Sequence, residues 1–241
     1  MQNTLKAPVV FEGVGLHSGA ATKMVLRPAA AGHGIWFRRV DISLGNAMIP
    51  ALWDAVERSP LCTRLVNDAG VSVSTVEHIM AALAGCGVHN VLIEIDGPEV
   101  PILDGSSAPF VRAIMTRGLR RLAAPGLAFE VMREVTVEHN GARATLKPSE
   151  NFEIEFHIDF ADAAIGRQSK LLDMRNGSFA RELCDSRTFC RQADVDQMHE
   201  NGLALGGTLE NAVVVDGDDV LSPGGFRHAD EAVRHKMLDA L

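Results

Sequence analysis

Two stretches of this 241-residue sequence repeat each other, HSGAATKMVLRPAAAGHGIWF at His17–Phe37 and HNGARATLKPSENFEIEF at His139–Phe156. Both begin with His, then Ser or Asn, then Gly-Ala, and both later carry Leu, a basic residue and Pro. A second echo follows each stretch, VEHIMAAL at Val76–Leu83 and VRHKMLDAL at Val233–Leu241. Such self-similarity predicts that the chain contains one structural unit twice.

Hydrophobic periodicity predicts the local structure of this unit. Residues 23–26, 142–146 and 153–158 have the pattern of strands, and residues 90–95 that of a buried strand. Residues 74–84 place their apolar side chains on one face of a helix, which we expect to end at Gly85. The sequence therefore predicts an α+β fold in which each half is a small sheet covered by helices.

The domain boundaries follow from the same alignment of the two halves. Ala-Ala-Pro-Gly at residues 123–126 is typical of a linker, so we expect domains at residues 1–123 and 127–241. The segment between Pro148 and His235 is longer than that between Pro28 and His78. This difference predicts an insertion in the second domain, around residues 162–207.

Composition narrows the class of protein. Hydrophobic residues make up 46% of the chain, which is enough for a packed core, and the net charge of −8 argues against a nucleic-acid partner. The sequence has neither a signal peptide at its start nor an apolar stretch long enough to span a bilayer, so we expect a cytoplasmic protein. The four cysteines form no CxxC pair, so a metal would be bound through His and carboxylate.

The second repeated segment of each half carries the residues that could bind a metal or take part in catalysis. His235 and Asp239 are four residues apart and so project from one helix face, where an imidazole and a carboxylate can bind one divalent ion. The repeat places His78 opposite His235 as a third ligand, which leaves a zinc ion an open position for water. Glu77, beside His78, is then a candidate general base for hydrolysis of an amide or ester.

Each of these residues also has an alternative interpretation without catalysis. Ser74 and Glu77 have the spacing of a capping box, which would use Glu77 only to close the start of the helix. The His235–Asp239 spacing is also that of an ordinary ion pair on a helix surface, and His78 alone is typical of a buried structural histidine.

Longer motifs resemble one enzyme family through nearly the whole chain. These motifs are FEGVGLHSG at 11–19, STVEH at 74–78, PILDGSSAPF at 101–110, SRTF at 186–189, GLALGGTLENAVVVD at 202–216 and VRHKMLD at 233–239. In this order they resemble the UDP-3-O-acyl-N-acetylglucosamine deacetylases, zinc amidases that commit bacteria to lipid A synthesis. The resemblance implies two similar α+β domains with the active site in the cleft between them.

The resemblance also implies a role for each residue of the site. It makes His78, His235 and Asp239 the zinc ligands and Glu77 the general base, while Thr188 would hydrogen-bond the oxyanion. Lys236 would contact the nucleotide part of the UDP-linked acylated glucosamine. The insertion would form an apolar passage for the acyl chain, and its candidate lining residues are Phe189, Val195, Met198, Leu203 and Ala204. Each of these is also typical of ordinary core.

In the family, the helix that carries the second zinc histidine continues, and a later Lys-Ser-Gly-His segment supplies a general acid; residues 1–241 contain neither. This difference leaves open a shortened chain, a second chain that supplies the missing part, or a natural truncation. Two functions compete as a result: hydrolysis of the acetamido group with release of acetate, and binding of the UDP-acylsugar by a catalytically weak or inactive homologue.

Overall fold

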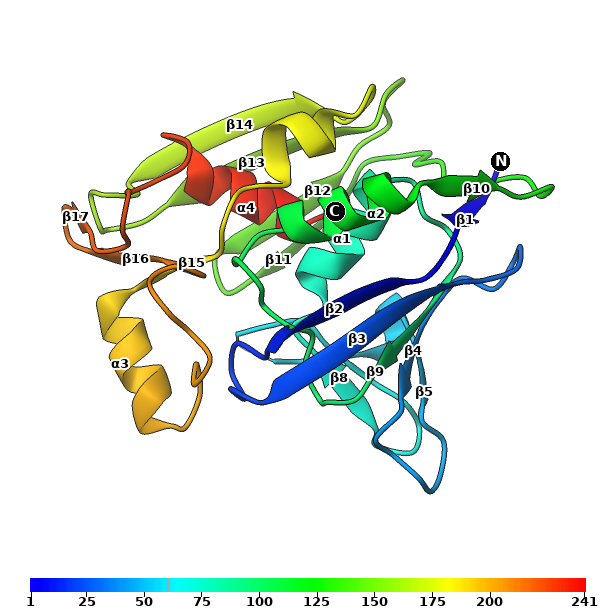
Figure 1. The fold of residues 1–241 in the computed structure, drawn as a ribbon. Coiled ribbons are helices and arrows are strands. Elements are labelled where there is room, and N and C mark those ends of the chain that lie inside the picture. The colour runs from blue at the N-terminus through cyan, green and yellow to red at the C-terminus, as the bar shows by residue number, and fades with distance from the viewer. Residues whose placement is uncertain (60) are drawn as a thin grey trace.

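The computed structural model describes residues 1–59 and 61–241, which form an α+β fold (Figure 1). The helices are α1 (Glu77–Gly85), α2 (Ala108–Arg117), α3 (Gln192–Glu200) and α4 (Glu231–Asp239), with a 3-10 turn η1 (Trp53–Ala55) and a π-helical turn η2 (Phe179–Leu183). The strands are β1 (Asn3–Leu5), β2 (Val9–Val14), β3 (Ala21–Pro28), β4 (Ile35–Arg39), β5 (Met48–Pro50), β6 (Val56–Glu57), β7 (Arg64–Val66), β8 (Ser72–Ser74), β9 (Val91–Ile95), β10 (Leu119–Arg121), β11 (Val135–His139), β12 (Ala142–Leu146), β13 (Glu153–Asp159), β14 (Arg167–Asp173), β15 (Phe189–Arg191), β16 (Val213–Asp216) and β17 (Asp219–Val220).

A five-stranded sheet in the order β2-β3-β9-β4-β5 forms the frame of the first half. Its pairings are antiparallel except for β4 with β9, which are parallel. The register brings Val9, Leu26, Ile93, Phe37 and Ile49 into one row across all five strands, and every one of them is buried. Because alternate residues of a strand share a face, this row marks the side of the sheet that faces the core.

Helix α1 begins three residues later than the periodicity predicted, at Glu77 instead of Ser74. Ser74 pairs with Arg64 as the last residue of β8, so it is held in an extended conformation and cannot start the helix. The alternative of a capping box is therefore wrong: Val76 occupies the N-cap position, and within the described residues no side chain caps this helix end. The predicted end at Gly85 is confirmed.

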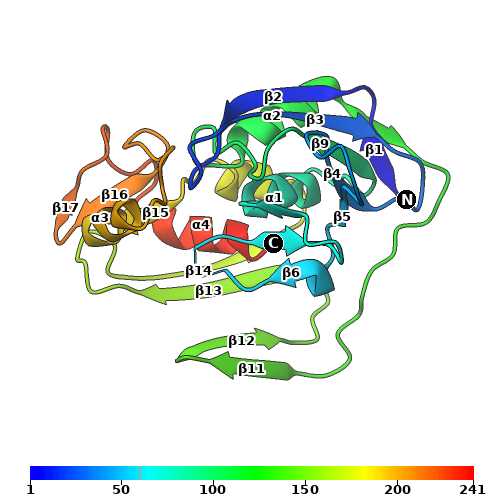
Figure 2. The ribbon, with the colours of Figure 1, turned by 90° about the horizontal axis from the view of Figure 1, so that it is seen from below.

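The second half is built from hairpins and one short mixed sheet. β11 pairs with β12, β13 with β14, and β15-β16-β17 form the sheet. The strands predicted here at residues 142–146 and 153–158 are present, as are those predicted at 23–26 and 90–95 in the first half. The β11–β12 hairpin stands apart from the rest in Figure 2, and nearly all of its residues are exposed.

One apolar core runs through both halves. It includes β-sheet and helix residues of the first half together with Phe179, Leu183, Met237 and Leu238 of the second. The contact is close at Gly85, where a Cβ atom would lie 2.0 Å from the ring of Phe179. A smaller second core lies around Ile165 and Val213.

The repeat detected in the sequence lies on elements of the same type in each half. Its first parts fall on β3 and β4 and on β12 and β13, and its helical echoes are α1 and α4. The described sheets around them differ, because β3 and β4 belong to the five-stranded sheet while β12 and β13 lie in separate hairpins. The duplication and the boundaries at 1–123 and 127–241, with the insertion around 162–207, remain predictions.

The helices of the described chain are short, and none of them has the length and apolar character that crossing a membrane requires.

Candidate functional site

Helices α1 and α4 lie side by side and bring His78 and His235 together (Figures 1 and 2). The ring centroids of the two histidines are 5.0 Å apart, and the ring planes are inclined by 82°. Both residues are buried, at 3% and 1% exposure. Burial lowers the pKa of His78 to about 3 and also lowers the pKa of His235. Both imidazoles are therefore held in the neutral form that binds metals.

Asp239 completes a cluster that could hold a metal ion. One ligand atom from each of His78, His235 and Asp239 lies within 4.8 Å of the others. Asp239 is one turn after His235, with its Oδ1 atom 3.4 Å from Nε2 of that histidine. This Oδ1 atom is buried and receives no hydrogen bond from the described residues. A buried carboxylate oxygen without a donor, beside two neutral imidazoles, fits a divalent cation.

The electrostatic environment keeps Asp239 ionised. Burial by itself raises the pKa of this carboxyl group, but the positive charge of Lys236 and its hydrogen bond act against burial, and the pKa is lowered. Lys236 donates a hydrogen bond of 2.9 Å from Nζ to Oδ2 of Asp239. One oxygen of the carboxylate is thus bound by lysine, and the other faces the histidines.

The tautomer of His235 is set by the backbone of a neighbouring loop. Nδ1 of His235 lies 2.9 Å from the carbonyl oxygen of Ser186, and since a carbonyl only accepts, Nδ1 carries the proton. Nε2 is then left with its lone pair directed toward Asp239 and the centre of the cluster. A hydrogen bond from the ring nitrogen that does not bind the metal commonly orients a metal-binding histidine.

Glu77 is the first residue of α1 and precedes His78. Its Oε2 atom accepts a hydrogen bond of 3.0 Å from the backbone N–H of Thr63. Burial raises the pKa of Glu77 to about 7, and the nearby carboxylate of Asp239 acts in the same direction. This carboxyl group is thus placed beside the cluster, with a proton affinity well above that of an ordinary glutamate.

The backbone turns sharply just before Glu77. Thr75 has a φ of 58°, a left-handed conformation that is strained for a β-branched residue. Its Oγ1 atom donates a hydrogen bond of 2.7 Å to Oε1 of the buried Glu99. Glu99 also accepts hydrogen bonds from the backbone N–H groups of His17 and Ser18. The carboxylate of Glu99 therefore holds the strained turn from which α1 starts.

The remaining predicted residues lie beside the cluster. The Nζ atom of Lys236 is 5.5 Å from the ring centroid of Phe189, whose ring is 6.3 Å from that of His235. Phe189 is the first residue of β15, and Thr188 precedes it. The backbone of Thr188 donates 2.8 Å to the carbonyl of Gly105. The seven residues predicted for the metal, for catalysis and for the substrate thus lie on α1, on α4, on β15 or directly before β15.

An apolar cavity of about 270 Å³ opens next to Thr188 and Phe189. Its walls include four of the five residues predicted to line a passage: Phe189, Val195, Met198 and Ala204. Leu203 instead lines a second, neighbouring cavity of about 300 Å³ together with His17 and Cys62, and its place in the passage stays a prediction. Leu203 follows the end of α3, and the next residue, Ala204, lies in the wall of the first cavity.

Residues 2–241 match the family model of UDP-3-O-acyl N-acetylglycosamine deacetylase. The chain belongs to this deacetylase family. It is 48% identical over 240 residues to the UDP-3-O-acyl-N-acetylglucosamine deacetylase of Phenylobacterium zucineum (strain HLK1), covering all of this chain and 82% of the relative. The same identity is found with that of Myxococcus xanthus (strain DK1622), of which 76% is covered. The deacetylase of Shewanella sp. (strain W3-18-1) is 44% identical over 241 residues, with 99% of this chain and 78% of the relative covered.

Sequence reasoning missed several residues that shape this candidate site. Ser186 and Arg187 lie within the SRTF motif, but the motif alone does not say that a carbonyl orients His235. Glu231 is four residues before His235, a spacing that could have drawn attention to it. For Glu99 the sequence holds no local signal, because its partners are more than 20 residues away.

Proposed function

We propose that this chain is a zinc-dependent amidohydrolase that converts UDP-3-O-acyl-N-acetylglucosamine to UDP-3-O-acyl-glucosamine and acetate, the committed step of lipid A biosynthesis. The single observation that supports it best is the cluster of His78, His235 and Asp239 with Glu77 beside it. Two histidines and one carboxylate are one of the donor sets of catalytic zinc sites, which keep a position open for water. In a member of this deacetylase family, such a cluster is best explained as the catalytic centre.

The metal and the protein contribute different parts of the chemistry. A divalent ion in this cluster would supply the Lewis acid that polarises the amide carbonyl and makes water more acidic. His235, fixed by Ser186, and Asp239, fixed by Lys236, keep their remaining donor atoms directed at the same point. Glu77 takes the proton from the attacking water and returns it to the departing amine. Water and the acetamide together give acetate and the protonated amine, so atoms and charge balance.

Two features beside the cluster suit the rest of the substrate. Thr188 lies at the wall of the apolar cavity, where its hydroxyl can donate to the oxyanion of the tetrahedral intermediate. Lys236, which is partly exposed, provides a point charge for the diphosphate of the nucleotide. The cavity itself suits the acyl chain, because apolar side chains of β15 and α3 form its walls.

The test is turnover of UDP-3-O-acyl-N-acetylglucosamine by the purified chain, followed by acetate release and appearance of the free amine. We expect activity to disappear when a chelator removes the metal and to return when zinc is added, with roughly one ion bound per chain. Parallel addition of iron shows whether that metal, which accepts the same ligands, serves instead. Unchanged turnover in thoroughly metal-free protein would contradict the proposal.

The competing function is binding of the UDP-acylsugar without hydrolysis. The family membership does not favour it, because the relatives are named as deacetylases. Calorimetric binding of the substrate without acetate release would nevertheless support it. The intact mass of the active species also tests the prediction of a second chain, since activity from a single polypeptide of 25.9 kDa would contradict it.

Substrates with shorter acyl chains test the role assigned to the cavity. Each CH₂ group removed costs about 0.8 kcal/mol of burial, so we expect affinity to fall about fourfold per group while the chain still lies in the cavity. Val195→Trp should narrow the cavity and raise KM for the longest chains, whereas Val137→Trp on the exposed hairpin serves as the control. Equal affinity for all chain lengths would refute the assignment.

We further propose a cytoplasmic location. It is supported by the four cysteines, Cys62, Cys86, Cys184 and Cys190, which form no disulfide in the described structure. Fractionation of cells that express the chain, with detection by antibody, would test it.

A further inference from the structure

Arg187 and Glu231 form an ion pair close to His235, and none of the roles predicted from the sequence involves either residue. Nε of Arg187 is 3.0 Å from Oε1 of Glu231, and its Nη2 atom is 3.2 Å from Oε2. The backbone N–H of Arg187 also donates to Oε1, at 2.9 Å. The side chains are 6% and 1% exposed, so both charges have left water.

Further hydrogen bonds satisfy this pair. The backbone N–H of Arg227 donates 2.5 Å to Oε2 of Glu231, and Nη2 of Arg187 donates 2.7 Å to the carbonyl of Gly225. Each oxygen of the buried carboxylate therefore accepts two hydrogen bonds. A fully bonded fork of this kind allows much less freedom of geometry than apolar packing does.

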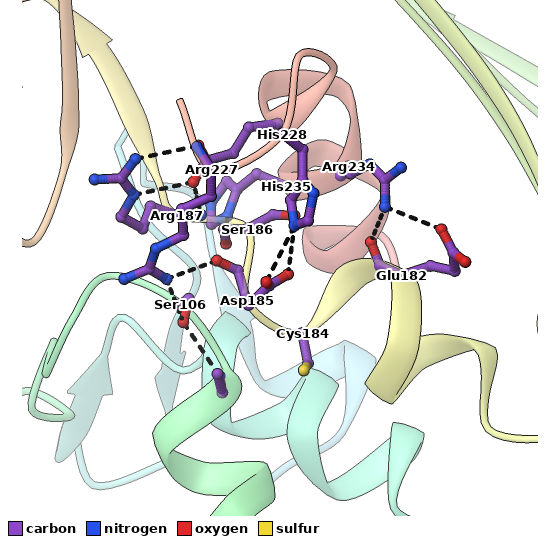
Figure 3. Close-up of polar contacts among 12 residues, drawn as sticks. Ser106, Glu182, Cys184, Asp185, Ser186, Arg187, Arg227, His228, Arg234 and His235 are labelled. Carbon is purple, nitrogen blue, oxygen red and sulfur yellow. Dashed lines mark hydrogen bonds and ion pairs between the residues drawn. The ribbon is translucent and has the colours of Figure 1, made fainter. Parts of the chain in front are cut away.

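Two successive residues before β15, Ser186 and Arg187, each bind a residue of α4. Glu231 and His235 are four residues apart, so both lie on the same face of α4. Arg187 binds Glu231, and the carbonyl of the preceding Ser186 accepts the hydrogen bond from Nδ1 of His235. Figure 3 shows Ser186 and Arg187 next to His235, with Arg227 reaching Asp185 and Ser106 on the other side. A shift of Arg187 would move the carbonyl that orients His235.

The residue on the other side of Arg187 is Thr188, whose backbone is fixed to Gly105 and to β16. Its N–H donates to the carbonyl of Gly105, and its carbonyl accepts from Val213, both at 2.8 Å. Arg187 therefore stands between the residue that orients a histidine of the cluster and a residue at the wall of the cavity. Three consecutive residues carry three separate positioning contacts.

We propose that Arg187 and Glu231 are positioning residues of the active site, and that their buried ion pair sets the orientation of the His235 ring through the carbonyl of Ser186. The inference rests on the proposed function for its effect on turnover. Its effect on metal geometry is independent of turnover.

The decisive experiment compares single and double substitutions. Arg187→Met and Glu231→Leu each leave one buried charge unpaired, so each should lower Tm. The double variant removes both charges and should regain much of the stability, since apolar groups often replace a buried pair without loss. If the pair positions the site, the double variant still has a kcat about 10- to 100-fold below wild type, with KM little changed.

Visible absorption of cobalt(II)-loaded protein reports the ligand geometry without any turnover. We expect the double variant to show a changed cobalt spectrum and about 10- to 100-fold weaker cobalt binding. Arg187→Lys keeps the charge but loses the fork, so it should fold and show a smaller change in both measurements. The matched control replaces the exposed pair of Arg191 and Asp194 by Met and Leu, and should leave spectrum and kcat unchanged.

Recovery of stability together with wild-type kcat and cobalt spectrum in the double variant would overturn the inference. If the double variant does not fold, a wild-type spectrum and kcat in Arg187→Lys would overturn it equally. Should wild type itself fail to release acetate, the proposed function fails, and the cobalt spectra still decide the inference.

Discussion

Helices α1 and α4 supply the two histidines of the site, yet different interactions hold them in place. The buried residues of α1 beyond the cluster are apolar, and the turn before it is fixed by Glu99 through hydrogen bonds from neutral donors. Helix α4 also buries apolar residues, but it is held by ion pairs at Glu231, Asp230 and Arg234 as well.

This contrast distinguishes interactions that stabilise the fold from interactions that orient the histidine rings. Apolar packing is non-directional, so it secures α1 against the core but does not set the angle of a ring. Hydrogen-bonded charges have defined geometry, and on α4 they act next to the histidine that needs a fixed tautomer. We therefore expect changes in the contacts that hold α1 to act mainly on stability, and changes in the contacts that hold α4 to act also on metal geometry.

The largest expected effect is the loss of metal binding when the histidine of either helix is replaced. His78→Ala and His235→Ala should each weaken zinc binding by more than about 100-fold, because removal of a ligand exceeds the usual effect of removing a partner behind it. Metal analysis after dialysis is the measurement, and His139→Ala on the exposed hairpin is the control. Undiminished zinc in either variant would show that this helix does not supply a ligand.

Glu77 tests whether α1 contributes chemistry as well as a ligand. Glu77→Gln should lower kcat by about 10²- to 10⁴-fold while zinc content stays as in wild type, since the amide cannot accept a proton from water. Single-turnover kinetics with parallel metal analysis would measure both. A loss of zinc in parallel with activity would instead assign Glu77 to the metal site.

Substitution of Glu99 tests the hydrogen bonds that fix the turn before α1. Burial raises the pKa of Glu99, but hydrogen bonds from His17, Ser18 and Thr75 outweigh it, so the pKa lies below the ordinary value of 4.5. A lowered pKa stabilises the fold above the unfolded-state pKa, and this contribution is lost as the pH falls through the folded-state pKa. Glu99→Gln should cost about 1–3 kcal/mol at pH 7 and progressively less in acid.

Denaturant unfolding at pH 7, 4.5 and 3 would measure this difference, with the exposed Glu210→Gln as control. A destabilisation that stays constant over this range would mean that the charge of Glu99 is not the stabilising feature.

The smallest effect is expected at the surface end of α4. Asp230 bonds Lys170 and Arg234, but it is partly exposed to water, which screens such pairs. Asp230→Asn should therefore cost less than about 1 kcal/mol in unfolding free energy and leave the cobalt spectrum unchanged. A larger loss, or an altered spectrum, would extend the positioning role from Glu231 to the whole start of α4.

Much of the site was readable from the sequence because helical spacing is a local property. The separation of four between His235 and Asp239 fixes their common face, and the repeat predicted that His78 lies opposite, which the 5.0 Å ring separation confirms. Local pattern also predicted two strands of the second half, β12 and β13. It failed at Ser74, where strand pairing with the distant Arg64 overrode helical periodicity.

The sequence by itself therefore determined the fold class, the family and the residue types around the cluster. Only the tertiary structure decided what holds them: the bond from His235 to Ser186 spans 49 residues, and the ion pair of Arg187 and Glu231 spans 44. The physical reason is that periodicity records which face of an element is buried, whereas hydrogen bonds between distant segments depend on how those elements pack.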